Sequence, residues 1–333
     1  MTTAREARVL EIIETARAKR PKFRDARITM AHGAGGKATR QLIEGLLAPA
    51  FNITALDDAA TVGELALTTD AFVVKPLRFP GGSIGELAVN GTVNDLAMGG
   101  ARPLALTLTL ILEEGLDAET LRAEVDAIAQ AAQAAGVQIV GGDTKVVERG
   151  HADGLYITTT GLGRRDPRAQ FAKPRPGDRI LLSGPIGAHG TAIMLARGEF
   201  DLAADIVSDT RSLWPAVDAI LGPGIRKLRD ATRGGVASVL NELAREAGVA
   251  MLVDEAAVPV APAVGGACEL LGIDPMYVAN EGVFVAISET SLPGFADIGE
   301  VKAEPPGMVL VNTAFGGRRV MDELVGDPLP RIC

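Results

Sequence analysis

The chain has 333 residues, a formal net charge of −9 and a hydrophobic content of 47%, which suits about two soluble globular domains. The acidic balance argues against nucleic acid as the main partner, because phosphate backbones need a basic surface, although carboxylates still bind nucleotides through Mg²⁺. Aromatic residues make up only 4% while glycine numbers 39, which favours tight turns and close packing of helices on sheets.

The N-terminal part combines a charged segment with a glycine-rich stretch. Residues 1–25 form an amphipathic pattern, predicted to be one helix that ends near Pro21. The glycine-rich stretch His32–Gly36 then leads through Lys37 into a helical apolar pattern that extends to Leu47. The following "ELALTTDAFVV" is typical of a strand, because its residues are β-branched and apolar.

The next elements have clear boundary signals. In "SIGELAVNGTVNDLAMGG", Ser83 as N-cap and Glu86 three residues later predict a helix that ends at Gly99–Gly100. "PLALTLTLIL" predicts a strand buried on both faces, because it is almost continuously apolar. "DAETLRAEVDAIAQAAQAAG" predicts an amphipathic helix capped by Asp117 and ended by Gly136, and "VQIVGGDTKVV" and "LYITTTGLG" predict strands.

The second half begins after a polar, proline-containing segment, "RRDPRAQFAKPRPGDR", which is the predicted domain boundary. "ILLSGPIGAHGTAIM" predicts a strand, a glycine turn and a helix, and "ATRGGVASVLNELAREAGVA" predicts a second helix that starts from glycine. "MYVANEGVFVAI" reads as two strands around a polar turn, "GMVLVNT" as a late strand and "MDELVGDPLPRIC" as a tail. Strands and helices that alternate with hairpin-like returns indicate an α+β or mixed α/β fold.

Nothing in the sequence indicates export or membrane insertion. Cys268 and Cys333 are too few for a disulfide framework and lack metal-binding spacing. The first residues are charged and contain no apolar signal core, and no stretch approaches the roughly 20 apolar residues of a membrane span. We therefore expect a reduced, cytoplasmic protein in which Cys268 is a small buried hydrophobic residue.

Four aspartates recur where a strand ends or a helix starts. They are Asp58, Asp70, Asp95 and Asp143. Carboxylate oxygens beside substrate phosphates are the ligands that Mg²⁺ prefers. A single aspartate at a turn is more often a cap, so the four together indicate a metal site without establishing one.

Glycine precedes several predicted helices. In "HGAGGK", the N–H groups of Gly33, Gly35 and Gly36 together with Lys37 either cradle phosphates or form a flexible turn. The spacing does not match a P-loop. The glycines of "SGPIGAHG" and "ATRGG" either bind anions or allow close packing.

Glu281 and Lys145 are ionisable residues within apolar strand patterns. Burial of either one alone would be costly. They are therefore either an acid–base pair in a cleft or a structural ion pair.

Several of these segments, in this order, resemble the HypE family of hydrogenase maturation factors within the AIR synthase-like (PurM-like) ATP-binding superfamily. They include "AHGAGGK", "FPGGSIGELAVNGTVNDLAMGGARP", "ILEEGL", "GGDTKVVERG", "VSD", "RDATRGGV", "ACELLG", "ANEG" and the terminal "PRIC". The resemblance extends from about Ile28 to Cys333, and "GGDTKVV" together with "PRIC" is highly specific.

The resemblance implies an α+β, two-domain PurM-like architecture that forms a homodimer. The expected parts are an N-terminal extension (1–27), a sheet-forming dimerisation and ATP-binding domain (28–168), a C-terminal α/β domain (169–320) and a flexible tail (321–333) that carries the reactive cysteine.

The family's function would give the terminal cysteine a use. The carbamoyltransferase HypF would place a carbamoyl group on Cys333, and ATP would phosphorylate the carbamoyl oxygen. Loss of phosphate would leave a thiocyanate. The HypC–HypD complex would then accept the cyanide for the iron of a [NiFe]-hydrogenase.

The resemblance also implies a role for each site residue. The catalytic residues would be Cys333, Glu281 and Lys145; Mg²⁺ would be held by Asp58, Asp70, Asp95 and Asp143; and ATP would be bound by His32, Gly33, Gly35, Gly36, Lys37, Asn94, Thr144, Asp230 and Thr232.

Two kinds of alternative stay open. Within the superfamily, the chain could be a cyclo-ligase, a selenophosphate synthase or a small-molecule kinase. A selenophosphate synthase carries a reactive cysteine or selenocysteine in its glycine loop, which "AHGAGGK" lacks, and a cyclo-ligase has no use for "PRIC". Of another class is a non-catalytic carrier whose tail docks a metallochaperone, and ATP turnover by the isolated chain would separate it from an enzyme.

Overall fold

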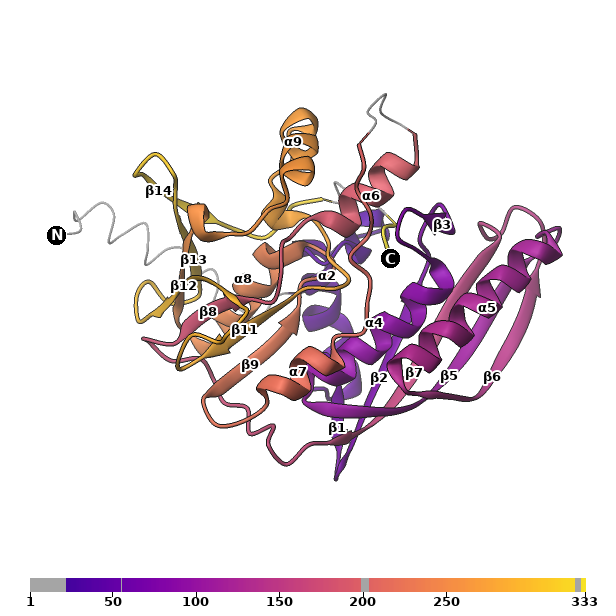
Figure 1. Ribbon diagram of the computed structural model, residues 1–333, viewed down its shortest axis with the longest axis horizontal. Helices are drawn as coiled ribbons and strands as arrows, with labels where there is room; N and C mark the ends of the chain where they lie inside the picture. The colour runs from indigo at the N-terminus through magenta and orange to yellow at the C-terminus, as the bar shows by residue number, and fades with distance from the viewer. Residues whose placement is uncertain (1–21, 55, 199–203, 327–330) are drawn as a thin grey trace.

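The computed structural model describes residues 22–54, 56–198, 204–326 and 331–333. The helix predicted for residues 1–25 therefore lies almost entirely outside the described residues. Each half of the chain builds its own sheet, and Figure 1 shows the first half in indigo to magenta beside the second half in orange to yellow.

The first half starts with short helical segments and then forms a five-stranded sheet. The segments are η1 (Met30–Gly33), α2 (Lys37–Leu42), η2 (Ile43–Leu47) and α3 (Ala48–Phe51). The sheet has the strand order β1-β2-β7-β5-β6, with β1 (Ala60–Val62), β2 (Leu65–Phe72), β5 (Ala101–Glu113), β6 (Gln138–Val147) and β7 (Leu155–Arg165). The short strands β3 (Arg78–Phe79) and β4 (Gly82–Ser83) pair separately.

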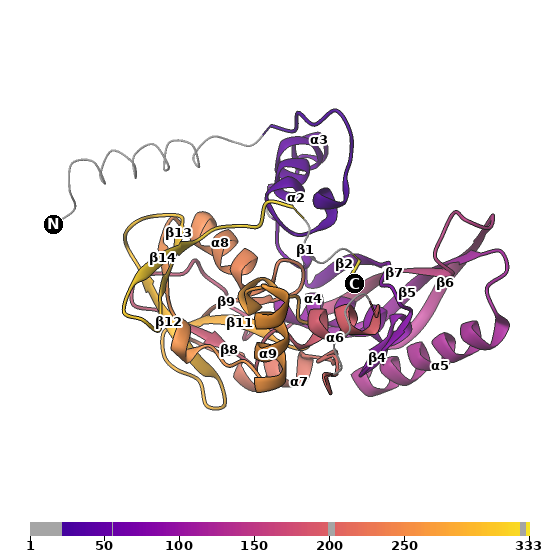
Figure 2. The same ribbon diagram turned by 90° about the horizontal axis from the view of Figure 1, so that it is seen from above.

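Two helices, α4 (Ile84–Met98) and α5 (Ala118–Ala135), pack on one face of this sheet (Figure 2). Ser83 caps α4 by accepting from the N–H of Glu86 at 3.5 Å, and Asp117 caps α5 by accepting from the N–H of Thr120 at 3.0 Å. Gly136 ends α5 with φ 69°, a left-handed conformation that glycine adopts without steric cost. These three sequence predictions are confirmed.

The other face of the first sheet is open. Leu65 and Leu67 on β2 are exposed, their neighbour Leu162 on β7 is half-buried, and buried and less buried residues alternate along the first part of β5. The prediction that β5 is buried on both faces is therefore wrong for a single chain. The apolar residues are present, but within the described residues no helix covers them.

The second half forms a seven-stranded sheet with the order β14-β13-β10-β12-β8-β11-β9. Its strands are β8 (Arg179–Leu182), β9 (Ile225–Asp230), β10 (Ala250–Asp254), β11 (Phe284–Ser288), β12 (Ala296–Lys302), β13 (Met308–Asn312) and β14 (Arg318–Met321). The helical elements are α6 (Ala188–Ala196), α7 (Trp214–Ile220), α8 (Gly235–Ala247), η3 (Glu255–Ala257), α9 (Pro262–Leu271) and η4 (Pro275–Tyr277). Cys268 on α9 is buried, as predicted.

One predicted strand is absent: the first half of "MYVANEGVFVAI" forms the end of η4 and a loop, and only β11 is extended. Asp274 accepts from the N–H of Met276 at 2.9 Å and so caps a helical turn. Pro275 favours the first helical position, because its φ is fixed near the helical value. Local capping therefore outweighs the β-branched composition.

Helix α4 lies between the two halves. Its last residues, Ala97 and Met98, pack with Leu213 beside α7 and with Phe284 of β11 in a shared core. Asp95 near the end of α4 is thereby brought toward Asp230, the last residue of β9. The candidate site lies at this junction.

Candidate functional site

The last residue of the chain is bound to the end of β2. The N–H of Val73 donates to a main-chain carboxylate oxygen of Cys333 at 3.0 Å, and the N–H of Lys75 donates to the carbonyl of Arg331 at 3.3 Å. These bonds follow an antiparallel pattern, so the tail tip extends the edge of the segment that follows β2.

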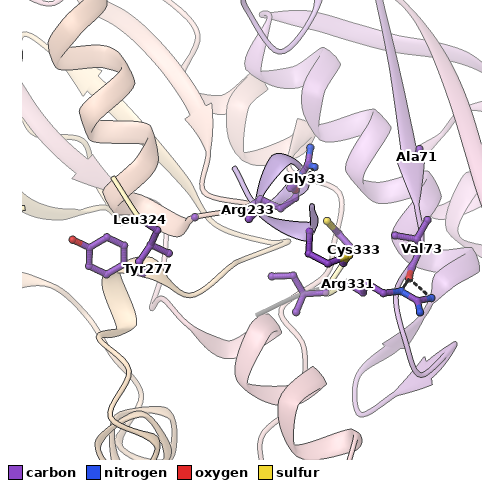
Figure 3. Close-up of a pocket in the computed structure, with 12 residues that line it drawn as sticks. Gly33, Ala71, Val73, Arg233, Tyr277, Leu324, Arg331 and Cys333 are labelled. Atoms are coloured by element: carbon purple, nitrogen blue, oxygen red, sulfur yellow. Dashed lines mark hydrogen bonds between the residues drawn. The ribbon is translucent and has the colours of Figure 1, made fainter. Parts of the chain in front are cut away.

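Arg331 anchors this arrangement. Its guanidinium donates twice to the carbonyl of Val73, at 3.1 and 3.2 Å, and forms an ion pair with Asp153. It also lies 5.8 Å from the ring centroid of Tyr156. Figure 3 shows the guanidinium turned toward Val73. Arg331 has φ 58°, which costs a non-glycine residue about 1 kcal/mol, so its side-chain contacts offset an unfavourable backbone conformation.

A cavity of about 150 Å³ surrounds the tail tip. Its walls come from segments far apart in the sequence, which include the glycine-rich segment at Gly33, the end of β2 at Val73, the turn at Arg233 and the tail itself. Figure 3 shows Gly33, Arg233 and Cys333 gathered at this cavity. The thiol-bearing residue is therefore inside a cleft that both halves of the chain build.

Two glycines of "HGAGGK", Gly35 and Gly36, are required by close packing. A Cβ on Gly35, which has φ 75°, would lie 2.6 Å from the carbonyl oxygen of Arg233, and one on Gly36 would lie 2.6 Å from that of Leu324. Arg233 in turn donates to the carbonyl of Gly33 at 2.8 Å. The segment thus forms a lid over the Arg233 turn and the stem of the tail.

His32 and Lys37 flank this segment. His32 is buried, with Nε2 2.9 Å from Asp25 and Nδ1 accepting from the N–H of Thr29 at 3.0 Å. Both ring nitrogens therefore hold the segment in place. Lys37 is exposed, and its N–H donates to the carbonyl of Leu324 at 3.2 Å. Its ammonium group lies on the surface of the lid.

A cluster of carboxylates lies where α4, β2 and β9 meet. Burial raises the pKa of Asp95 well above its usual range, and repulsion from Asp230, Asp70 and Asp58 raises it further. Burial and then repulsion from Asp58 have the same effect on Asp230. The pKa of Asp70 is raised mainly by burial, while Arg233 opposes the shift.

Glu281 belongs to the same cluster. It is buried, in the loop before β11, and its pKa is raised well above the usual range by burial and by repulsion from Asp230, Asp70 and Asp209. A carboxyl group of this kind takes up a proton near neutral pH more readily than an ordinary glutamate. The prediction that Glu281 is buried is confirmed.

Arg233 is one of the cations beside this cluster. Its pKa is raised first by the negative charge of Cys333, the residue that ends the chain, and then by Asp70, Glu281 and Asp95. It therefore lies between the tail tip and the carboxylates. No local signal in "RDATRGGV" marks Arg233 as a site residue, since only the fold places this side chain beside Cys333.

Asp58 is engaged by basic residues of β9. It forms an ion pair with Arg229, and its neighbour Asp57 forms one with Lys227. Burial nevertheless raises the pKa of Asp58, although the coulombic attraction of Arg229 opposes the shift. Asp58 thus lies at the edge of the cluster, where Arg229 already neutralises its charge.

Asp143, Thr144 and Lys145 lie apart from the cluster. All three are on β6, at the opposite edge of the sheet from β1, and all are exposed. Lys145 Nζ lies 2.5 Å from Asp143, and its hydrogen bond lowers the pKa of that aspartate. Within one chain Lys145 therefore pairs with Asp143 and not with Glu281, because it lies on an exposed edge strand.

Asn94 and Thr232 lie beside the cluster in different settings. The Asn94 amide donates to the carbonyls of Arg211 at 3.0 Å and Glu281 at 3.2 Å, and accepts from the N–H of Leu213 at 2.7 Å. It thereby joins α4 to two loops of the second half. Thr232 is half-buried in the turn between Asp230 and α8.

The donor set suits a hard cation. Mg²⁺ would neutralise mutually repelling carboxylates, and nucleotide phosphates would supply further oxygen ligands to the ion. Within the described residues of one chain, however, no three His, Cys, Asp or Glu side chains come close enough to form a metal site by themselves. Mg²⁺ usually takes only one or two carboxylates, with substrate phosphates and water completing the shell, and the cluster fits that requirement.

Comparison with known proteins places this chain in a family. Residues 56–165 match the N-terminal domain, and residues 175–307 the C-terminal domain, of AIR synthase related proteins. A protein of Rhodobacter capsulatus named carbamoyl dehydratase HypE is 47% identical, over 93% of this chain and 99% of its own length. The chain belongs to the HypE family. The carbamoyl dehydratase HypE of Escherichia coli is 43% identical, over 92% of this chain and 99% of its own length.

Solved structures of HypE proteins are also similar. The match to a HypE–HypF complex has a TM-score of 0.80 at 44% identity and covers 85% of this chain and 99% of the other. The match to a hydrogenase maturation protein HypE in complex with ATP has a TM-score of 0.78 at 40% identity, over 92% and 100%. A thiamine monophosphate kinase, at 20% identity, shares the fold alone. The predicted α+β, two-domain PurM-like fold is confirmed, and none of the helices in the described ranges is both long and apolar enough to cross a membrane.

Proposed function

We propose that this chain is an ATP-dependent carbamoyl dehydratase that converts a carbamoyl group on its own Cys333 into a thiocyanate. The observation that carries the proposal is the docked tail, because Cys333 lines one cavity with the glycine-rich lid and Arg233. Membership of the HypE family supports it, and so does the existence of a similar HypE structure with ATP.

The proposed reaction removes one water from a thiocarbamate, S–C(=O)–NH₂. The carbamoyl oxygen attacks the γ-phosphorus of ATP, a P–O bond forms, the bond to ADP breaks, and one N–H proton leaves. Loss of the second N–H proton then forms the C≡N triple bond as the C–O bond breaks and phosphate departs. Phosphorylation is needed because an amide oxygen is a poor leaving group, and such a transfer depends mainly on positioning and charge neutralisation.

The residues of this chain have distinct proposed roles. Glu281, with its raised pKa, accepts a proton from the carbamoyl nitrogen. Arg233 stabilises the negative charge that develops beside Cys333. Lys145 contributes a second cationic or proton-transferring group, and it would do so from the partner subunit, since it lies away from Glu281 in its own chain.

The proposed homodimer forms through the open face of the first sheet. This face carries Leu65, Leu67 and Leu162, whose exposure in a single chain leaves an apolar surface in water. Pairing of two such faces would bury it and bring β6 of one subunit toward the carboxylate cluster of the other. Each complete site would then contain Asp143 and Lys145 of the partner subunit.

The proposed magnesium ligands come from the same assembly. Asp70 and Asp95, with Asp58 at the edge, face the nucleotide phosphates, and Asp143 is supplied by the partner subunit. Bound Mg²⁺ would neutralise phosphate charge and relieve the repulsion that raises the pKa of Asp95.

ATP is proposed to bind between the lid and the β9–α8 turn. Backbone N–H groups of Gly33, Gly35 and Gly36 and the ammonium group of Lys37 would face the phosphates, with Asp230 and Thr232 below them. His32 and Asn94 would support the site through the backbone contacts described above. Thr144 would contact the nucleotide from the partner subunit.

HypF is the proposed carbamoyl donor, since a similar HypE has been solved in complex with it. A HypC–HypD complex is the proposed acceptor of the cyanide for a [NiFe]-hydrogenase. The proposed division of the chain is an extension (1–27), an ATP-binding domain (28–168), a second domain (169–320) and the tail (321–333).

Mass spectrometry of the C-terminal peptide tests this function. After incubation with HypF, its carbamoyl donor and ATP, the Cys333 peptide is expected to gain one carbamoyl group and then to lose one water. Cys333→Ala should fold and bind ATP but acquire neither modification. ATP hydrolysis without the dehydration step, together with a carbamoyl group on Cys268, would overturn the proposal.

A further inference from the structure

A buried histidine holds the peptide that precedes Cys333. His189 lies in the first turn of α6 and is fully buried. Its Nε2 is 2.7 Å from the carbonyl oxygen of Ile332, and its Nδ1 is 2.8 Å from Oγ of Ser208. A carbonyl oxygen only accepts hydrogen bonds, so Nε2 carries the hydrogen and donates to the tail, while Nδ1 accepts from the Ser208 hydroxyl.

The surroundings fix this histidine in one state. The Ser208 Oγ also accepts from the N–H of Thr210 at 3.1 Å, and the Ser208 N–H donates to the carbonyl of Pro80 at 2.8 Å. The ring of Phe79 packs edge-on against His189 at 5.5 Å. Burial lowers the pKa of His189. The ring is therefore neutral, fixed in orientation and able to donate only to Ile332.

The residue after Ser208 holds Glu281. The Asp209 carboxylate accepts from the N–H groups of Glu281 and Gly282, each at 3.1 Å. A Cβ on Gly282 would overlap with the carbonyl oxygen of Asp209. Arg211 donates to the carbonyl of Gly282 at 3.0 Å and closes the loop from the other side. Ser208 thus supports the tail through His189, and its neighbour Asp209 supports the loop that carries Glu281.

We propose that Ser208 and Asp209 form a positioning element that holds the docked Cys333 and Glu281 in a fixed relation, Ser208 acting through His189 and Asp209 directly. Both are positioning residues, since neither contacts the reacting atoms. This inference rests on the proposed function and adds to it the residues that set its geometry. Because the tail must leave the cleft to meet a donor protein, the His189 bond opposes loading of Cys333 and favours the dehydration that follows.

The first test measures docking without any carbamoyl chemistry. Full-length protein is treated with iodoacetamide, and the alkylation rate of Cys333 is read from the C-terminal peptide. His189→Leu should alkylate about tenfold faster, the factor expected for loss of one buried hydrogen bond. His189→Gln, which keeps a donor near the Nε2 position, should stay closer to the wild-type rate. Buried Cys268 should remain unmodified and serves as the internal control for folding.

The second test separates the two reaction steps. With HypF, its donor and ATP, His189→Leu and Ser208→Ala should load Cys333 at least as fast as the wild type but dehydrate it more slowly. Asp209→Asn should slow dehydration and leave the alkylation rate unchanged. Ser208→Ala provides the docking test if His189→Leu does not fold.

Two results would overturn the inference: wild-type alkylation rates in both His189→Leu and Ser208→Ala, or loading and dehydration that fall together in all variants. The alkylation assay also keeps this inference separate from the proposed function. If the wild type never dehydrates its tail, the function fails, while the alkylation rates still report on the His189 contact.

Discussion

The N–H of Val73 donates to a main-chain carboxylate oxygen of Cys333 at 3.0 Å, so the last residue of the chain is bound three positions after Asp70. This bond links the tail tip to the strand that carries one of the clustered carboxylates. Arg331, which "PRIC" places two residues earlier, does not approach the cluster but anchors the tail at Asp153. The tail is therefore held by its arginine and its backbone, while its thiol-bearing residue lies in the cavity.

The anchor predicts how readily the tail undocks. Asp153→Asn removes the charge partner of Arg331 but keeps a side chain of the same shape. Both side chains are partly exposed, so solvent screens the pair and about 1 kcal/mol is the expected effect. Alkylation of Cys333 by iodoacetamide should accelerate about fivefold.

Arg122→Ala is the matched control for this measurement. Arg122 forms an exposed pair with Glu119 on α5, far from the tail. Its loss should leave the alkylation rate of Cys333 unchanged. An Asp153→Asn rate equal to that of Arg122→Ala would show that the anchor does not hold the tail in solution.

The carboxylate cluster predicts a pH-dependent stability. A carboxyl group whose pKa is higher in the folded than in the unfolded chain destabilises the fold once the pH exceeds the unfolded value. For Asp95 that loss begins near its ordinary pKa of 3.8 and is complete above its raised folded pKa. Asp95→Asn should therefore melt above the wild type at pH 8 without magnesium, and the difference should shrink toward pH 4.

Scanning calorimetry in EDTA measures this difference in Tm. A change of 1 kcal/mol in the free energy of unfolding corresponds to about 2–4 °C for a domain of 150–250 residues. Asparagine keeps an acceptor for the Thr68 hydroxyl, which donates to Asp95 at 2.7 Å. Asp143→Asn is the control. Lys145 lowers the pKa of Asp143, so loss of this carboxylate should not raise the Tm. A lower Tm for Asp95→Asn than for the wild type at pH 8 would contradict the role of repulsion.

Local signals in the sequence predict most of the helices and strands, but they do not predict which residues meet in the candidate site. Ser83, Asp117 and Gly136 set helix boundaries through contacts within a few residues, so the sequence predicts them well. The contacts of His189 with Ile332 and of Arg233 with Gly33 join residues more than a hundred positions apart. No periodicity or capping motif encodes such pairs.

The strand β5 shows a different limit. Its apolar run correctly indicates a surface that avoids water, but a single sequence does not say whether the cover comes from the same chain. The segment "GGDTKVV" shows the same limit. The family resemblance implies that Asp143 and Lys145 are site residues, but within one chain the fold places them away from Asp95.

The open face predicts a dimer that one charge should disrupt. Leu67 on β2 is 38% exposed within a single chain, and in the proposed dimer it would be covered. Leu67→Glu would bury a carboxylate there, which is strongly unfavourable, so light scattering at micromolar concentration should show a monomer. Val125→Glu, on α5 over the opposite face, should remain dimeric. A monomeric wild-type protein in the presence of ATP would refute the dimer.

Mixed dimers give the sharpest test of a shared site. If Asp95 of one subunit and Asp143 of the other face the same nucleotide, Asp95→Asn and Asp143→Asn should each abolish Mg²⁺-dependent ATP hydrolysis while the fold stays intact. Co-expression of the two variants should restore about a quarter of the wild-type rate, because about half of the dimers are mixed and each mixed dimer has one intact site. Mixed dimers purified through a different affinity tag on each subunit should reach about half of the wild-type rate of ATP hydrolysis. If both residues served a site within one subunit, the mixed dimers would be inactive, and normal turnover by Asp143→Asn alone would remove that residue from the site.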